Sequence, residues 1–292
     1  MEKLCGLLNL NKPAGVTSRD VVDVALRSVR PAKAGHAGTL DPLATGVLVV
    51  CVGSATRLIR YVQQMRKHYT GTFLLGRSSP TEDIEGDVTE LCNPTIPSRQ
   101  QLEAAAASLT GEILQRPPAF SAKKVLGQRA YALARLGKAV RLKPHRVTVY
   151  RLAVAEYDYP RLVLDVECSS GTYVRSLGRD MAERLGSAAI MSALVRTAIG
   201  PFRLTEAILP GELTGENVRD RLLPPLVAVA GVPQVFLEEE TLCDIRLGKA
   251  IPRPPGLPCA EEYAGLDPTG RLATILVPRG DDRIGPALNL DV

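Results

Sequence analysis

The feature of this sequence that most constrains its fold is an uninterrupted apolar run, Val47 to Val52, which directly follows a glycine-rich loop, Gly35 to Gly46. Four of the six residues in this run are valines, whose branched side chains favour strands. A strand without alternating polar residues is typical of a sheet that is covered on both faces. The run is also far shorter than the roughly 20 apolar residues that a membrane-spanning helix needs. We therefore expect a layered protein built on a sheet, with no membrane segment.

The chain is long enough to bury a large core without disulfide or metal staples. Its 292 residues amount to two domains, at roughly 150 residues per domain. A folded monomer of this size buries roughly three-quarters of the surface that the unfolded chain exposes. Hydrophobic residues at 45% and charged residues at 23% are ordinary for globular proteins and exclude a disordered chain. The net charge of +5 permits an anionic partner without requiring one.

Cysteine and histidine usage argues against a metal site. The six cysteines form no C-x-x-C pair and the chain has only three histidines, so no zinc site is expected. Scattered cysteines in a large domain are typical of free thiols in a reducing compartment. Asn9, Asn11 and Lys12 interrupt any apolar signal-peptide region at the N-terminus. We expect a cytoplasmic protein that holds no metal.

The remaining segments mix strands and helices without the regular alternation of a βαβ protein. Further strands are expected at 7–10, 69–75, 146–155 and 161–168. Helices are expected at 54–64, 101–109 and 174–185. A further helix is expected to begin after a cap at Thr17 or Ser18, with an apolar stripe formed by Val21, Val22, Ala25 and Val29. This order favours the α+β class, with a mixed, mostly antiparallel sheet flanked by helices.

A change of character near residue 235 divides the chain. The segment Leu222 to Pro233 contains three prolines. From residue 234 onward we expect short strands and proline-rich turns with no long helix. The sequence therefore predicts two domains, residues 1–235 and a small C-terminal β domain at residues 236–292.

The glycine-rich loop is also the first candidate for chemistry. Gly35, Gly38 and Gly46 permit backbone conformations with positive φ and the close approach of another molecule. Asp41 precedes Pro42, which biases Asp41 away from the α region and holds its carboxylate in an extended or turn geometry. On composition alone, an Asp-Pro pair in such a loop is most often a turn. A rigid loop beside a sheet is nevertheless a suitable place for a catalytic carboxylate.

The residues of this loop resemble a known family. Gly35 to Leu48 resembles the catalytic motif of the TruB family of tRNA pseudouridine synthases, in which Asp41 matches the catalytic aspartate; Ala37 stands where the family usually has threonine. The resemblance continues at residues 8–18, 67–69, 115–137 and 168–175 and so extends along most of the chain. It implies the pseudouridine synthase fold for residues 1–235 and, more weakly, a PUA-like RNA-binding domain for residues 236–292.

The resemblance implies an isomerase that converts the T-loop uridine of tRNA, position 55, to pseudouridine on a flipped-out base. The glycosidic bond moves from N1 to C5 of the base. A carboxylate such as Asp41 is ionised at pH 7 and can act as the nucleophile, at either C6 or C1′. Arg175 would orient and pair with this carboxylate, and Tyr69 would stack on the base and is a candidate for proton handling at C5. The reaction is redox-neutral, so no cofactor or metal is expected.

The resemblance also implies which residues contact RNA. His36 matches a histidine associated with everted bases rather than with proton transfer, and Tyr173 matches a pocket residue. Phosphate contacts are expected from Lys12, Arg57, Lys67, Lys123 and Arg129, and the segment from Lys123 to Gly137 resembles an RNA-gripping insertion. The expected partner is the T stem-loop of tRNA, bound by a monomer that needs no protein partner.

One loop departs from the family pattern. After the K-x-Y strand the family often carries G-x-x-T-D-T-x-D-x-x-G, and here Gly76 to Gly86 reads G-R-S-S-P-T-E-D-I-E-G. Thr81, Asp83 and Gly86 are retained, whereas Pro80 replaces the first acid. Because of this substitution, the resemblance gives weaker support for assigning the family's role to the first half of this loop.

Two other functions remain open from the sequence. The first is an RNA-guided pseudouridine synthase subunit, whose relatives carry a fuller PUA domain and often lysine-rich tails. The second is a non-catalytic RNA-binding or RNA-folding protein, against which the joint retention of Asp41, Tyr69 and Arg175 argues. Each residue also has a structural alternative: a turn for Asp41, an ordinary strand aromatic for Tyr69 and a surface helix arginine for Arg175.

Overall fold

The computed structural model of this chain describes residues 3–120, 124–125, 128–129 and 142–291. It divides into two compact units. Unit 1 comprises Met1–Pro42, Val47–Gln64 and Pro201–Val292, and unit 2 comprises Leu43–Gly46 and Met65–Gly200. This division does not test the predicted boundary near residue 235, which stays a prediction.

The apolar run forms the centre of the first sheet in unit 1. Strand β3 (Thr45–Val52) lies beside β1 (Gly6–Lys12) and pairs antiparallel with β2 (Ala34–His36). All side chains from Val47 to Val52 are fully buried, which confirms the predicted strand with two covered faces. Helix α1 (Ser18–Val29) begins after a capping box made by Thr17 and Asp20, and its predicted apolar stripe packs against Leu8, Leu10, Leu48 and Val50.

The other elements of unit 1 before residue 230 are short. The single helix predicted at 54–64 is a 3₁₀-helix, η1 (Gly53–Leu58), followed by a short α-helix, α2 (Ile59–Gln64). The helix type was therefore wrong for residues 54–58. Further along are β13 (Phe202–Arg203), η2 (Leu204–Glu206), η3 (Pro210–Glu212), α6 (Val218–Arg221) and η4 (Pro225–Val229).

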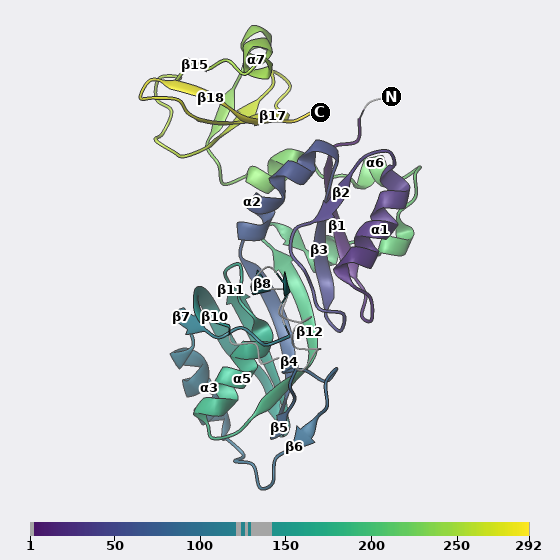
Figure 1. Cartoon of the computed structure of the whole chain (residues 1–292), viewed down its shortest axis with the longest axis vertical. Coiled ribbons are helices and arrows are strands. Elements are labelled where there is room, and N and C mark those ends of the chain that lie inside the picture. The colour runs from purple at the N-terminus through teal and green to yellow at the C-terminus, as the bar shows by residue number, and fades with distance from the viewer. Residues whose placement is uncertain (1–2, 121–123, 126–127, 130–141, 292) are drawn as a thin grey trace. The chain divides into compact units, whose positions relative to one another are not determined.

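The C-terminal segment forms a second sheet with its own core, as predicted (Figure 1). Its order is β14-β16-β17-β18-β15, with bounds Gln234–Phe236, Tyr263–Leu266, Leu272–Pro278, Arg283–Asn289 and Ile251–Pro252. Strands β14 and β16 are parallel, and the other pairs are antiparallel. Helix α7 (Glu239–Arg246) was not predicted; its buried Leu242 and Ile245 belong to this core.

Unit 2 is built on one antiparallel sheet whose order is β12-β4-β11-β10-β7. The bounds are Ala189–Ile199, Lys67–Leu75, Arg161–Cys168, His145–Asp158 and Gly111–Gln115. In the same unit, Thr45 and Gly46 pair in parallel with Val195 and Arg196 of β12. The expected α+β class with a mixed, mostly antiparallel sheet is therefore confirmed.

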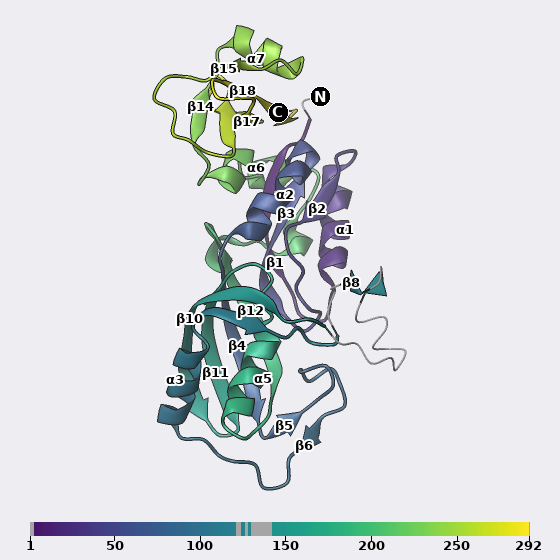
Figure 2. The same ribbon diagram turned by 60° about the vertical axis from the view of Figure 1, so that its left-hand side comes forward.

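Two helices lie against the same face of this sheet, as Figure 2 shows. They are α3 (Arg99–Ser108), capped by Ser98, and α5 (Val174–Arg184). Helix α5 packs closely on β4, because a Cβ atom at Gly178 would lie 2.1 Å from the Phe73 ring. Two short hairpins complete the unit: β5 (Arg77–Ser78) with β6 (Thr89–Glu90), and β8 (Lys124–Val125) with β9 (Gln128–Arg129).

Within the described residues, we find no helix with the length and apolar character of a membrane span. The same residues contain no cluster of three or more His, Cys, Asp or Glu side chains arranged to hold a metal ion.

Candidate functional site

Hydrogen bonds hold both chain neighbours of Asp41 in unit 1. The Leu40 amide donates to Ser18 Oγ at 2.8 Å, and Ser18 Oγ donates to the Leu40 carbonyl at 3.1 Å. The Pro42 carbonyl accepts from Lys12 Nζ at 3.1 Å and from the Gly15 amide at 2.9 Å. Asp41 itself is half-buried. The end of β1 and the start of α1 therefore fix the backbone on each side of this carboxylate.

This arrangement explains why two separate motifs of the sequence occur together. Residues 8–18 form β1 and the start of α1, and three residues of this stretch, Lys12, Gly15 and Ser18, supply the groups that bracket Asp41. Lys12 is fully buried, and its ammonium also donates to the Pro13 carbonyl at 3.0 Å. The N-terminal motif is thus a scaffold for the loop that carries Asp41.

In unit 2, Gly46, Arg196 and Tyr69 stand in register on three adjacent strands. Arg196 pairs with Gly46 on one side and with Tyr69 on the other. Gly46 has φ near +100°, and a Cβ atom there would lie 2.3 Å from the Arg196 carbonyl oxygen, so only glycine allows this approach. The Arg196 guanidinium carbon lies 6.0 Å from the centre of the Tyr69 ring. A buried cation therefore lies within reach of the half-buried Tyr69 ring.

Lys67 is buried beside this group. Its Nζ donates to the Met65 carbonyl at 2.6 Å. Burial, with a smaller contribution from the nearby positive charge of Arg196, lowers the pKa of Lys67 to about 8. A lysine with this pKa is partly neutral in mildly alkaline solution.

Arg175 lies in the first turn of α5, and the start of that helix is fixed from β7. Gln115 is fully buried; its Oε1 accepts from the Tyr173 amide at 2.8 Å and its Nε2 donates to the Tyr173 carbonyl at 3.0 Å. Tyr173 is half-buried and its ring makes an edge contact with His145 at 6.1 Å between centroids. These two hydrogen bonds fix the backbone of Tyr173, the residue that precedes α5.

The Arg175 guanidinium is buried, and its contacts within unit 2 include three hydrogen bonds. Its Nη1 donates to the Thr81 carbonyl at 2.7 Å and to Asp83 Oδ2 at 3.1 Å, and its Nη2 donates to the Phe120 carbonyl at 3.1 Å. Asp83 is 2% exposed and also accepts from Thr81 Oγ1 at 2.5 Å and from the Glu85 amide at 3.1 Å. The pairing of Asp83 with Arg175 was not predicted from the sequence. The retention of Asp83 in the family pattern of the 76–86 loop could have indicated that this residue has a role.

The proposed RNA contacts differ in accessibility. Arg57 is exposed, and its Nη1 donates to the Asn289 carbonyl at 2.8 Å. His36 is half-buried at the end of β2, whereas Lys12 and Lys67 are buried. Lys123 lies outside the described residues, and Arg129 is described only as part of β9. All of these assignments stay predictions.

Comparison with protein families gives one match that spans half of the chain. Residues 26–174 match the family described as TruB family pseudouridylate synthase (N terminal domain). The tRNA pseudouridine synthase B of Arthrobacter sp. (strain FB24) is 40% identical over 289 residues, covering 95% of this chain and 94% of that protein. That of Dehalococcoides mccartyi (strain ATCC BAA-2266 / KCTC 15142 / 195) is 37% identical over 287 residues, covering 97% and 95%.

Solved structures share the fold. A chain in the crystal structure of a Cbf5-Nop10-Gar1 complex has a TM-score of 0.72 and 26% identity, covering 98% of this chain and 83% of its own length. A chain in the archaeal box H/ACA sRNP Nop10-Cbf5 complex has a TM-score of 0.72 and 23% identity, covering 98% and 86%. The similarity to the second chain concerns the fold alone.

Proposed function

This chain belongs to the TruB family of pseudouridylate synthases, and from that premise we propose that it converts the T-loop uridine of tRNA, position 55, to pseudouridine with Asp41 as the nucleophile. Membership makes the chain an isomerase that acts on RNA. The finer assignment of the uridine and of the nucleophile is our proposal. The observation that carries it is the set of hydrogen bonds that holds Leu40 and Pro42 on either side of Asp41.

The proposed reaction breaks one bond and forms another without any redox change. The bond between N1 of the base and C1′ of the ribose breaks, the bond between C5 and C1′ forms, and C5 loses the proton that N1 gains. Asp41 attacks either C6 or C1′ and is released at the end, so that the carboxylate is regenerated. A loop held on both sides of the nucleophile limits the motion of the carboxylate during these steps.

Tyr69 and Arg175 are proposed as the other catalytic residues. Tyr69 offers an aromatic face for the extruded base and a hydroxyl that can move the proton at C5. Arg175 is proposed to orient the catalytic carboxylate and favour its ionised form, as the family resemblance implies. Gly46, five residues after Asp41, stands in register with Arg196 and Tyr69, which supports a common role for these segments.

The proposed partner is the T stem-loop of tRNA. Extruding a uridine from a folded loop costs a few kcal/mol, and stacking on one aromatic ring returns about 1–3 kcal/mol. Phosphate contacts from Arg57, Lys123 and Arg129 are proposed to supply the rest. Tyr173 is proposed to line the pocket and His36 to contact RNA where bases are everted. The protein is proposed to act as a cytoplasmic monomer, with residues 236–292 as a PUA-like RNA-binding domain.

An assay on unmodified transcripts tests this proposal. The purified chain is incubated with a T-arm hairpin or a whole tRNA transcript and no guide RNA, and pseudouridine is located by carbodiimide mapping and mass spectrometry. We expect modification at the T-loop uridine in both substrates. Asp41→Asn keeps the size of the side chain but removes the nucleophile, so the rate should fall by more than about a hundredfold while RNA affinity persists.

The outcomes separate the alternatives left open by the sequence. Modification that requires a guide RNA would identify an RNA-guided subunit. Tight binding of the hairpin without any modification would identify an RNA-binding or RNA-folding protein. Pseudouridine formed by Asp41→Asn at more than about a hundredth of the wild-type rate would remove Asp41 from the role of nucleophile.

A further inference from the structure

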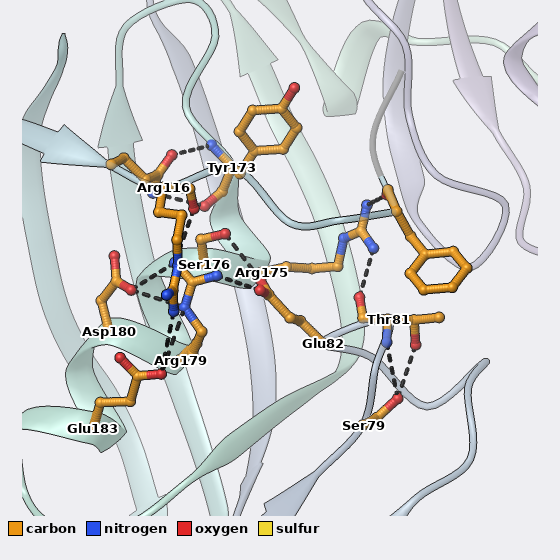
Figure 3. Close-up of polar contacts among 12 residues, drawn as sticks. Ser79, Thr81, Glu82, Arg116, Tyr173, Arg175, Ser176, Arg179, Asp180 and Glu183 are labelled. Carbon is orange, nitrogen blue, oxygen red and sulfur yellow. Dashed lines mark hydrogen bonds and ion pairs between the residues drawn. The ribbon is translucent and has the colours of Figure 1, made fainter. Parts of the chain in front are cut away.

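Two arginines one turn apart on α5 hold two consecutive acids of the 76–86 loop. Arg175 pairs with Asp83. Arg179 pairs with Glu82, as Figure 3 shows. The Glu82 carboxylate also accepts from Ser176 Oγ at 2.9 Å. The side chains of Arg179 and Glu82 are only 11% and 13% exposed, so water screens this ion pair weakly.

The backbone at Glu82 makes this double contact possible. In an extended chain, consecutive side chains point in opposite directions, and only one of the two carboxylates would face α5. Glu82 instead has φ near +62°, a left-handed conformation that disfavours residues with a Cβ atom. The Glu82 carbonyl accepts from the Met191 amide at 2.9 Å and the Ile84 amide donates to the Met191 carbonyl at 3.1 Å, which ties the loop to β12. The surrounding contacts therefore maintain an unfavourable conformation at this residue.

The same two arginines also hold the segment before residue 121. Arg179 Nη2 donates to the Arg116 carbonyl at 2.9 Å, and Arg175 Nη2 donates to the Phe120 carbonyl at 3.1 Å. Two further acids near Arg179 lie on α5 itself: Asp180 Oδ1 is 2.7 Å from Nη2, and Glu183 Oε1 is 3.9 Å from Nε. Glu82 is thus the loop's own contribution to the charge balance of Arg179.

We propose that Glu82, acting through Arg179 and Ser176, is a positioning residue for Arg175. It fixes the loop that presents the Thr81 carbonyl and the Asp83 carboxylate to the Arg175 guanidinium. Glu82 fills a position that the family pattern of this loop leaves open, whereas the acid expected two residues earlier is replaced by Pro80. This inference rests on the proposed catalytic role of Arg175.

The test compares two glutamates that reach the same arginine. Glu82→Gln removes the charge contributed by the loop, and Glu183→Gln removes a charge contributed by the helix, whose side chain is 54% exposed. Steady-state rates are measured over a range of T-arm RNA concentrations, which gives kcat and KM separately, at a temperature where circular dichroism shows every variant to be folded. We expect a loss of roughly tenfold to a hundredfold in kcat for Glu82→Gln, from misplacement of a catalytic group, with KM changed less than about twofold. Glu183→Gln should stay within about twofold of the wild type.

A double-variant cycle separates positioning from mere stabilisation. If Glu82 acts through Arg175, adding Glu82→Gln to Arg175→Lys should lower the rate less than it does in the wild type. A purely structural role would lower the melting temperature and leave kcat at low temperature unchanged. If Glu82→Gln does not fold, Arg179→Lys takes its place, because it keeps the charge but loses the planar fork.

The failures are distinguishable. A wild type without activity contradicts the proposed function, and a fully active Arg175→Lys contradicts the catalytic role of Arg175. An active wild type in which Glu82→Gln matches Glu183→Gln overturns the positioning role of Glu82. The positioning role is also overturned if Glu82→Gln lowers the rate by the same factor in the wild type and in Arg175→Lys.

Discussion

Tyr69, the residue proposed to stack on the uridine, lies beside an arginine that is almost completely buried. Arg196 is 1% exposed, and its guanidinium lies 6.0 Å from the centre of the Tyr69 ring. A cation beside one face of an aromatic ring favours a fixed ring orientation. The orientation of the Tyr69 ring is therefore favoured by a residue that carried no signal in the sequence.

Substitutions at Tyr69 separate stacking from proton transfer. Tyr69→Phe keeps the aromatic face and loses the hydroxyl, whereas Tyr69→Ala loses both. Stacking contributes about 1–3 kcal/mol, so Tyr69→Ala should weaken binding of the T-arm hairpin by roughly 5-fold to 150-fold relative to Tyr69→Phe. If the hydroxyl moves the proton at C5, Tyr69→Phe binds normally and turns over slowly. Equal hairpin affinity for the Phe and Ala variants would contradict the stacking role.

Lys67 gives the stability of the protein a defined pH dependence. Its pKa is about 8 in the folded chain, against 10.5 for an ordinary lysine, because burial and Arg196 disfavour its charge. Between these two pH values the unfolded chain binds more protons than the folded chain. The free energy of unfolding of the wild type should therefore rise relative to that of Lys67→Met as the pH increases from about 8 to 10.5.

Urea unfolding of the wild type and Lys67→Met at pH 7, 8.5 and 10 measures this effect. The comparison removes the contribution of other groups that titrate in both proteins. A constant difference between the two proteins across this range would show that the folded-state pKa of Lys67 is not lowered.

At the scale of elements, local patterns predicted the strands and helices that carry a single clear signal. Val47 to Val52 was recognised because its valines leave no alternative to a covered strand, and α1 because its stripe and cap agree. Strand β12 was missed. Its pairing with β4 is interrupted by register shifts after Met191 and Arg196, which disturb the alternation expected of a strand. Such irregularities depend on neighbouring strands and leave no local pattern.

The site shows the same limit. Motifs identified Asp41, Tyr69 and Arg175 as candidates. The pairing of Arg175 with Asp83 and of Arg179 with Glu82 was not predicted, because it joins a loop and a helix about 90 residues apart. The left-handed backbone of Glu82, which permits both pairs, is rare for a residue other than glycine. Sequence spacing alone therefore does not predict these contacts.

Close packing between α5 and β4 predicts the effect of a small substitution. Gly178→Ala normally stabilises a helix by about 1 kcal/mol. Here the added methyl group would lie 2.1 Å from a ring carbon of Phe73, which is fully buried and cannot move aside. Overpacking costs about 1–3 kcal/mol, so we expect a net loss of stability.

Urea unfolding tests this expectation against a matched glycine. Gly215 has open space around its Cβ position, so Gly215→Ala should change the free energy of unfolding by less than about 0.5 kcal/mol. Adding Phe73→Leu to Gly178→Ala should cost less than the sum of the two separate changes. A stabilised Gly178→Ala would show that the helix and the strand are less closely packed than the structure indicates.

At the scale of the whole molecule, charge is distributed unevenly along the chain. Residues 1–235 carry 30 Lys and Arg against 21 Asp and Glu, whereas residues 236–292 carry six against ten. A polyanion such as RNA is attracted to the first part and repelled by the second. If residues 236–292 bind RNA, as the PUA-like assignment proposes, they do so against their net charge. Affinity that depends on phosphate neutralisation should therefore come from residues 1–235.

Two arginines with similar surroundings test this distribution. Arg57 in η1 and Arg279 after β17 are both exposed, and each donates one hydrogen bond to a carbonyl of β18, at Asn289 and Pro286 respectively. The affinity for T-arm RNA is measured from 50 to 200 mM salt, and log K is plotted against log salt. Removing one phosphate contact should reduce the slope by about 0.7–0.9, so Arg57→Gln should show this reduction and Arg279→Gln should not. Equal slopes for the two variants would contradict a phosphate contact at Arg57. A reduced slope for Arg279→Gln alone would show that the acidic C-terminal sheet nevertheless provides the electrostatic contact to RNA.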